Sequence, residues 1–140
     1  MSLDVVTAII ASLGLGGLVG TILQSFMSNR NKVFEDAFSK KAERYKAIMI
    51  LMWTSLDPKS ELRHLKFFRS DIQNTETLRR ELKLELYNMM LYAGDNVMRS
   101  FKQFVKKPNH KNYAKVALEM RKDLYGKRTN IDFDEIKIEL

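Results

Sequence analysis

The hydrophobic pattern of this chain begins with a long segment that carries no charge. Val5–Asn29 has no charged residue, and 23 residues of it, Val5–Met27, are mainly Val, Ile, Leu, Ala and Gly. A helix that crosses a bilayer needs about 20 predominantly apolar residues. The segment lacks the basic start and short apolar stretch of a cleaved signal peptide. It also has fewer polar interruptions than a buried core helix. We therefore predict a transmembrane helix in residues 1–29.

The predicted orientation of this span follows from the basic residues beside it. Six basic side chains follow the segment closely, and none precedes it: Arg30, Lys32, Lys40, Lys41, Arg44 and Lys46. Basic residues near a span favour the cytoplasmic side. We expect residues 30–140 to form a cytoplasmic domain and the N-terminus to lie outside.

Small and polar residues recur every four positions along the segment. They are Ala8, Ser12, Gly16, Gly20 and Gln24. Four-residue spacing places them on one helix face, and small side chains let membrane helices approach closely. We predict that copies of the chain associate through this face. Such a face suits a narrow pore or a buried dimer contact equally well.

Helical spacing continues after the uncharged segment. Neither Gly nor Pro occurs between Thr21 and Asp57, so one helix is expected from Leu3 to Ser55, with a possible bend at residues 25–31. Its predicted apolar face comprises Phe34, Phe38, Tyr45, Ile48 and Met52. Asp57–Pro58 then predicts a second helix start, with Asp as N-cap and Pro at the first helical position. That short helix presents Leu62, Leu65 and Phe68.

The remainder predicts further helices. After a turn at residues 70–75, apolar residues at steps of three and four predict one helix of about 30 residues that runs through Gly94 to Pro108. These positions are Leu78, Leu82, Leu86, Met89, Ala93, Val97, Phe101 and Phe104. Asn109 is expected to cap a last helix that ends at Gly126.

The tail, residues 131–140, has two readings. It resembles a short capped helix, which we favour, although Ile136, Ile138 and Leu140 alternate as a strand would. The predicted fold class is all-α, with an N-terminal transmembrane helix that continues into a cytoplasmic helical bundle.

Charge adds a preference for anionic partners. Residues from Arg30 onward carry 24 basic and 16 acidic side chains, an excess of eight positive charges. Such an excess favours lipid headgroups, nucleic acids or nucleotides. A solvated basic surface beside a membrane explains it as well. The residues nearest the span, among them Lys40 and Lys41, suit anionic headgroups.

Two runs of basic residues are the candidate site for an anionic ligand: Arg79 and Arg80, and Lys102, Lys106, Lys107, Lys111 and Lys115. Phe101, Phe104 and Tyr113 are interleaved with the lysines. Lysine and arginine bind phosphates, and aromatic rings stack on the bases of single strands. The helical spacing of Phe101 and Phe104 favours the alternative that both belong to the core.

No sequence feature points to catalysis. The chain has no Cys, only two His, and none of the motifs for nucleophilic, nucleotide-binding or metal chemistry. Helical nucleases of the HEPN type need an Arg four to six residues before a His, whereas Arg63 adjoins His64 and Arg99 lies eleven before His110. We predict no enzyme, no catalytic residue, no metal ligand and no cofactor.

The layout resembles the small membrane effectors of bacterial anti-phage systems. The features that carry the likeness are the small-residue face from Ala8 to Gln24, the uninterrupted helix that follows, and the basic runs. It is similar in plan to the effector of Hailong defence systems, whose cytoplasmic domain binds single-stranded DNA oligomers that hold it inactive. Pore-forming accessory proteins of some RNA-guided systems have a similar plan, but their HEPN-type Arg/His pair has no counterpart here. The resemblance covers the architecture and assigns no individual residue.

Two functions are consistent with these features. The first is a channel or toxin effector in a bacterial inner membrane, assembled from four or more copies and regulated by an oligonucleotide or nucleotide. The second is a membrane-anchored helical adaptor that recruits a protein partner. A membrane-bound nuclease is a third reading, for which the catalytic residues are missing.

Overall fold

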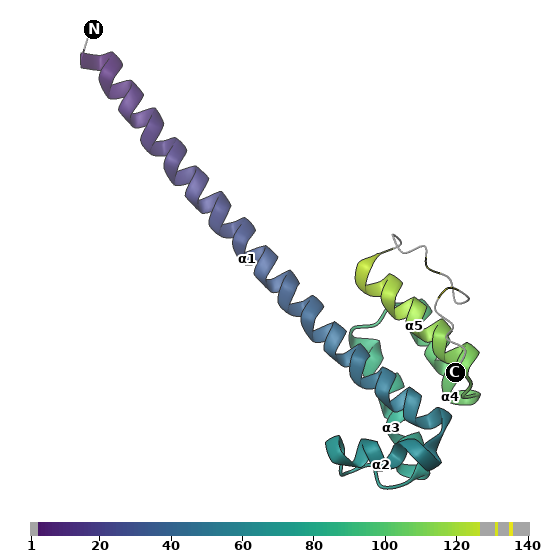
Figure 1. Cartoon of the computed structure of the whole chain (residues 1–140). Coiled ribbons are helices and arrows are strands. Elements are labelled where there is room, and N and C mark those ends of the chain that lie inside the picture. Colours follow the sequence, from purple (N-terminus) through teal and green to yellow (C-terminus); the bar gives the residue numbers. More distant parts are fainter. Residues whose placement is uncertain (1–2, 127–130, 132–134, 136–140) are drawn as a thin grey trace. The chain divides into compact units, whose positions relative to one another are not determined.

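The protein is all-helical over the residues described by the computed structural model, which confirms the all-α part of the predicted fold class. These are residues 3–126, 131 and 135, with side chains described from residue 21 onward. The elements are α1 (Leu3–Leu56), α2 (Pro58–Phe68), α3 (Thr75–Asn88), the 3-10 turn η1 (Met89–Leu91), α4 (Asp95–Lys106) and α5 (His110–Tyr125) (Figure 1). The chain divides into two compact units, Met1–Ser39 and Lys40–Leu140.

The first helix is continuous, as predicted from the absence of Gly and Pro after residue 20. It spans 54 residues, and residues 25–31 remain helical. Over the part of the chain that the structure describes, no helix is both long enough and apolar enough to cross a membrane. The predicted span lies mostly in residues 5–20, and the side chains of those residues are outside the described part.

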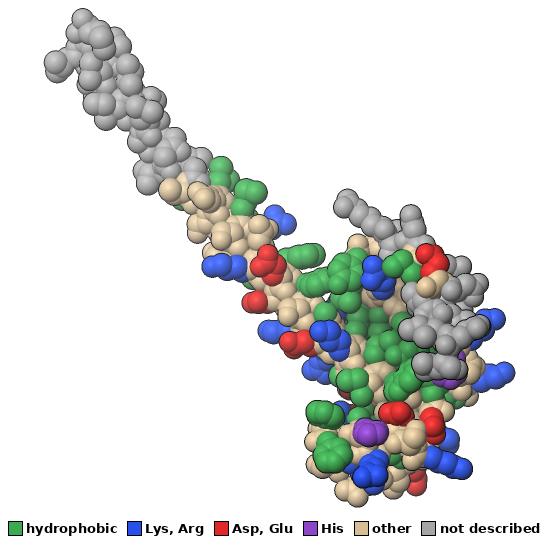
Figure 2. Space-filling view, in the orientation of Figure 1, with side chains coloured by type: hydrophobic (Ala, Val, Ile, Leu, Met, Phe, Trp, Pro, Cys, Tyr) green, Lys and Arg blue, Asp and Glu red, His purple; other side chains and the backbone are tan. Residues whose placement is uncertain are grey.

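The core of the second unit is formed by all five helices and the connecting segments. Core residues that are at most 5% exposed include Ile48 and Met52 of α1, Leu65 of α2, Ile72 of the turn before α3, Leu78 and Leu82 of α3, Met89 of η1, Val97, Phe101 and Phe104 of α4, and Val116 and Met120 of α5. Six of the eight apolar positions predicted between residues 78 and 104 are thus confirmed as core, and Leu86 and Ala93 are partly buried against it. Figure 2 shows hydrophobic side chains gathered on one face of this unit.

The predicted apolar face of α1 is correct only within the second unit. Tyr45, Ile48 and Met52 are buried. Phe34 is 75% exposed and belongs to the first unit. The pattern continues into the first unit, where Phe34 is exposed, so periodicity alone overestimated the buried length of α1.

The single helix predicted from residue 74 to Pro108 is wrong, because the structure divides it into α3, η1 and α4. Gly94 is the N-cap of α4 with extended backbone angles, φ −70° and ψ 156°. A helical Gly costs about 1 kcal/mol relative to Ala. Here the Gly94 N–H instead donates to Asp123 Oδ2 at 3.3 Å. The apolar steps agree on both sides of the break, which is why periodicity did not reveal it.

The end of α2 differs from the prediction at one apolar position. Leu65 is buried, but Phe68 is 87% exposed. The helix ends at Phe68, and a turn in which the Ile72 N–H donates to the Arg69 carbonyl at 3.1 Å returns the chain to the core. Ile72 is 1% exposed, so this segment contributes Ile72 to the core, and Phe68 lies outside it.

The predicted helix ends are otherwise confirmed. Pro58 is at the start of α2, although the Asp57 carboxylate accepts from the Ser60 hydroxyl and not from a backbone N–H. Asn74 caps α3 and accepts from the Thr77 N–H at 2.8 Å. Gly126 follows α5 with a positive φ of 75°. The prediction for the tail lies almost wholly outside the described residues.

Candidate anion-binding surface

The helices α4 and α5 form a hairpin, and residues 107–109 form the turn that joins them. Proline has no N–H and disfavours a helical residue before it, so α4 ends at Lys106. Asn109 Oδ1 accepts from the Asn112 N–H at 2.8 Å and starts α5. The Asn112 side-chain amide donates to the Lys107 carbonyl at 2.8 Å. These bonds hold a short turn between two helices that pack side by side.

Five exposed lysines lie on this hairpin, and we call them the lysine surface: Lys102, Lys106, Lys107, Lys111 and Lys115. Lys115 Nζ reaches across from α5 to Gln103 Oε1 of α4 at 3.1 Å. Over the described residues, none of the five is in an ion pair with a carboxylate. Figure 2 shows Lys and Arg side chains over much of this unit. The structure thus brings the five predicted lysines onto one hairpin.

The spacing of these lysines has an energetic consequence. Lys102 and Lys106 are one helical turn apart, and so are Lys111 and Lys115. Like charges at this spacing destabilise a helix by about 0.2–0.5 kcal/mol per pair. A multivalent anion that neutralised them would remove this cost.

The two predicted arginines lie on another helix. Arg79 and Arg80 are exposed on α3 and line a surface hollow with Glu76, Thr77 and Lys83. Within the described part of the chain, no contact joins them to the lysine surface. The predicted site therefore consists of two separate basic areas.

The aromatic residues on α4 belong to the core. Phe101 and Phe104 are fully buried, which confirms the core interpretation and excludes them as stacking surfaces. Tyr113 is half-buried and packs against Phe104 with ring centroids 6.4 Å apart. Its burial raises the pKa of the Tyr113 hydroxyl, which therefore stays protonated at neutral pH.

A second group of aromatic residues was missed by the sequence analysis. Trp53 of α1 lies against the start of α5, with its ring centroid 6.1 Å from that of His110 and 5.8 Å from that of Tyr113. Both pairs are edge-to-face, an arrangement favoured by aromatic quadrupoles. Trp53 remains 43% exposed, and His110 is exposed. The only signal in the sequence was that Trp53 is the sole tryptophan.

Asp123 of α5 links three elements of the second unit. Its carboxylate accepts from Lys41 Nζ at 2.7 Å, from the Tyr45 hydroxyl and from the Gly94 N–H. Burial alone would raise the pKa of Asp123, but these bonds outweigh it and hold that pKa below its ordinary value. Burial is the main cause of the raised pKa of Tyr45, and the hydrogen bond to Asp123 raises this pKa further. At neutral pH the carboxylate is thus ionised and the Tyr45 phenol is protonated.

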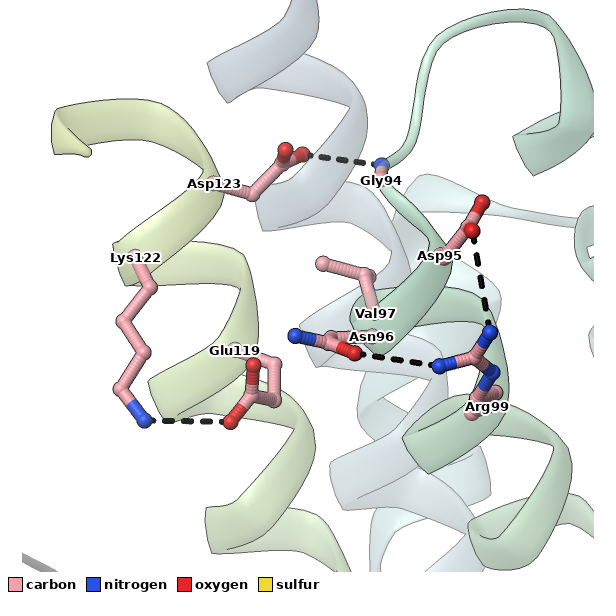
Figure 3. A pocket seen from close by; sticks show the side chains of 8 residues that line it. All are labelled: Gly94, Asp95, Asn96, Val97, Arg99, Glu119, Lys122 and Asp123. Atoms are coloured by element: carbon pink, nitrogen blue, oxygen red, sulfur yellow. Dashed lines mark hydrogen bonds and ion pairs between the residues drawn. The ribbon is translucent and has the colours of Figure 1, made fainter. Parts of the chain in front are cut away.

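Figure 3 shows a hollow beside this carboxylate, between the start of α4 and the last turns of α5. Its charges compensate one another. Arg99 Nη2 lies 3.7 Å from Asp95 Oδ2, and Lys122 Nζ lies 3.1 Å from Glu119 Oε1. Because Arg99 and Lys122 are already paired with carboxylates, this hollow is a weaker candidate for an anionic ligand than the lysine surface.

The residues predicted for span association all lie on α1. The side chains of Ala8, Ser12, Gly16 and Gly20 are outside the described part. Gln24 is exposed and lines a surface hollow of the first unit with Leu23 and Met27. Its polar side chain is therefore accessible to a second helix.

No three or more His, Cys, Asp or Glu side chains gather at a potential metal site within the described residues. No protein-family model, curated protein or solved structure matches the chain.

Proposed function

We propose that this chain is a channel-type membrane effector of bacterial defence that an anionic ligand regulates. The uncharged segment in residues 5–29 anchors it in the inner membrane, with the N-terminus outside. Four or more copies associate through the face formed by Ala8, Ser12, Gly16, Gly20 and Gln24. The second unit is cytoplasmic, and its lysine surface binds an oligonucleotide or a nucleotide.

The observation that carries the proposal is the composition of α1. This one helix contains the uncharged segment and also Tyr45, Ile48 and Met52, which are core residues of the basic unit. Any rearrangement of the core around them therefore acts on the helix that carries the predicted span. A ligand shifts such an equilibrium only if it binds the open and closed states with different affinity.

The contact between α5 and α1 supports this coupling. Lys41 and Tyr45 of α1 both bind the Asp123 carboxylate of α5, and α5 carries Lys111 and Lys115. A ligand that moved the hairpin would strain these bonds. The hairpin is thus connected to α1 through the contacts of Lys41 and Tyr45 with Asp123.

The first test is the mass of the full-length protein in nanodiscs, by light scattering and native mass spectrometry. We expect a discrete assembly of four or more copies, and ion flux in liposomes that changes when a single-stranded oligonucleotide is added on the side of the basic unit. A monomer or dimer would leave no path for ions through one helix per chain and would overturn the proposal.

The adaptor function is supported by a different observation. Leu84 and Tyr87 of α3 and Leu91 of η1 follow helical spacing and are 50%, 70% and 88% exposed. Exposed apolar stripes of this kind favour protein partners. The adaptor function predicts a monomer or dimer without ion flux and a partner that Leu84→Glu releases. The channel function predicts that flux is insensitive to Leu84→Glu.

A further inference from the structure

We propose that Trp53 and His110 form a stacking platform for an unpaired nucleobase, so that the ligand of the lysine surface is a single-stranded oligonucleotide. This inference rests on the proposed function, because it specifies the anionic ligand that the basic unit binds. It adds a site made from α1 and α5, which are far apart in the sequence.

The geometry places aromatic and basic groups at the same end of the hairpin. His110 is the first residue of α5, directly before Lys111 and three positions after Lys107. The Trp53 ring lies beside the His110 ring, with centroids 6.1 Å apart. A strand whose phosphates meet Lys107 and Lys111 therefore has exposed rings within reach of its bases.

The exposed part of the Trp53 ring suits a ligand with flat apolar groups. Phosphate groups alone need only cations, and they gain nothing from an indole ring. Leaving 43% of a tryptophan in water forgoes part of the burial that its size offers. The base of a single strand presents a π-face that stacks on such a ring whatever its sequence.

Duplexes and lipid surfaces fit these groups less well. Bases within a duplex are stacked on each other and are inaccessible to a protein ring. A bilayer surface supplies anionic headgroups for the lysines, but it has no flat aromatic group that stacks on the Trp53 ring. The unpaired strand is the anion that uses both the lysines and the rings.

Trp53 is the only tryptophan of the chain, so its fluorescence reports from the site without a label. The full-length protein in nanodiscs of neutral lipid is titrated with a short oligothymidylate, the matching oligouridylate, an abasic strand of equal length, inorganic polyphosphate, and vesicles of anionic lipid. We expect the two strands with bases to quench Trp53. The abasic strand and polyphosphate should bind more weakly and leave the fluorescence unchanged. The two base-bearing strands distinguish DNA from RNA.

Substitutions test the energetic contribution of the ring, with affinity measured through a dye on the oligonucleotide. Trp53→Leu should weaken oligothymidylate binding about 5- to 150-fold and leave abasic-strand binding unchanged, since a stacked base contributes about 1–3 kcal/mol. His110→Ala should weaken it in the same direction. The control is Tyr87→Leu, which removes an aromatic residue that is 70% exposed on α3 and should have no effect. Circular dichroism checks that each variant is folded.

Several outcomes overturn the inference. Tight oligothymidylate binding without quenching, and unchanged in Trp53→Leu, would leave an electrostatic ligand site and no stacking platform. Equal quenching by polyphosphate would have the same meaning. Quenching by anionic vesicles alone would make the site a membrane contact. If no anion bound the basic unit at all, the inference and the proposed regulation would both fail.

Discussion

At the scale of single residues, Asp123 determines how α5 meets the rest of the second unit. Its carboxylate accepts three donors, from Lys41, Tyr45 and Gly94. Hydrogen bonds that involve a charged group contribute about 1.5–3 kcal/mol each when they are well shielded. The side chains of Lys41 and Asp123 are 24% and 20% exposed, so water screens this ion pair only in part.

Replacing Asp123 by Asn should lower the free energy of unfolding by about 1–3 kcal/mol, because the ion pair is lost and the Lys41 ammonium is left without its partner. Chemical denaturation of the full chain measures the change. Asp95→Asn is the matched control. Its ion pair with Arg99 is long, at 3.7 Å, and largely exposed, so little change is expected. Equal effects of the two variants would contradict the role of Asp123.

The same residue makes stability depend on pH with a defined sign. The pKa of Asp123 is lower in the folded chain than the value of about 3.9 expected when unfolded. The ionised Asp123 carboxylate therefore contributes its full stabilisation at pH values above the unfolded pKa. This stabilisation is lost as the pH falls through the folded pKa. The stability difference between the wild type and Asp123→Asn should thus be large at neutral pH and shrink below about pH 4. A constant difference in pH-dependent denaturation would argue against an ionised Asp123.

Gly94→Ala should be destabilising through Asp123. A Cβ at Gly94 would lie 2.7 Å from Asp123 Oδ1, so the carboxylate would have to move away from Lys41 and Tyr45. In an Asp123→Ala background the obstacle is absent, and the substitution should cost little. A double-mutant cycle measures the coupling, which we expect to exceed about 0.5 kcal/mol. If the two substitutions changed the free energy of unfolding additively, the cost of Gly94→Ala would not arise from its contact with Asp123.

At the scale of elements, local chemistry predicted most helix ends and failed where tertiary contacts decide. Pro108 and Asn109 marked the hairpin because their preferences are local. At the break, the Gly94 N–H donates to the carboxylate of Asp123, a residue 29 positions later. Helical spacing continues across such a break without interruption, so the pattern could not show it.

The residues of the candidate site were likewise predicted only where they lie close together in the sequence. The five lysines of the hairpin were predicted because they are close in sequence. Trp53 was missed, because only the packing of α1 against α5 brings it to His110. Phe101 and Phe104 show the converse, since residues adjacent to the lysines in sequence face the core. Proximity in sequence therefore identified the charges of the site but not its rings.

Charge reversal on the hairpin tests the lysine surface as a unit. Lys106→Glu with Lys107→Glu should weaken oligonucleotide binding steeply at low salt. It should also reduce the slope of log affinity against log salt by about 1.4, if each lysine meets one phosphate of a single strand. Lys59→Glu with Lys66→Glu is the matched control, because it changes the net charge equally on α2. A similar loss in both double variants would indicate a general charge effect, and not a site.

At the scale of the whole molecule, assembly would change what the basic unit can do. Residues from Arg30 onward carry an excess of eight positive charges per chain. Closed symmetry would repeat the lysine surface around an axis and concentrate its potential. A ligand with several phosphates would then meet several copies at once, which raises its affinity without any new contact. Ligand binding and assembly are thus expected to be linked.

The glycines of the uncharged segment allow a matched test of that assembly. Gly16→Leu with Gly20→Leu fills two positions of the four-residue repeat and should prevent close helix approach. Gly14→Leu with Gly17→Leu adds the same apolar bulk on other faces of the same helix and should be tolerated. We expect the first pair alone to lose the assembly in nanodiscs, the ion flux, and the gain in oligonucleotide affinity that comes from multiple copies. If both pairs assembled normally, the copies would have to meet through another face. If both lost assembly, the whole circumference of the helix would be packed, as in a bundle without a small-residue seam.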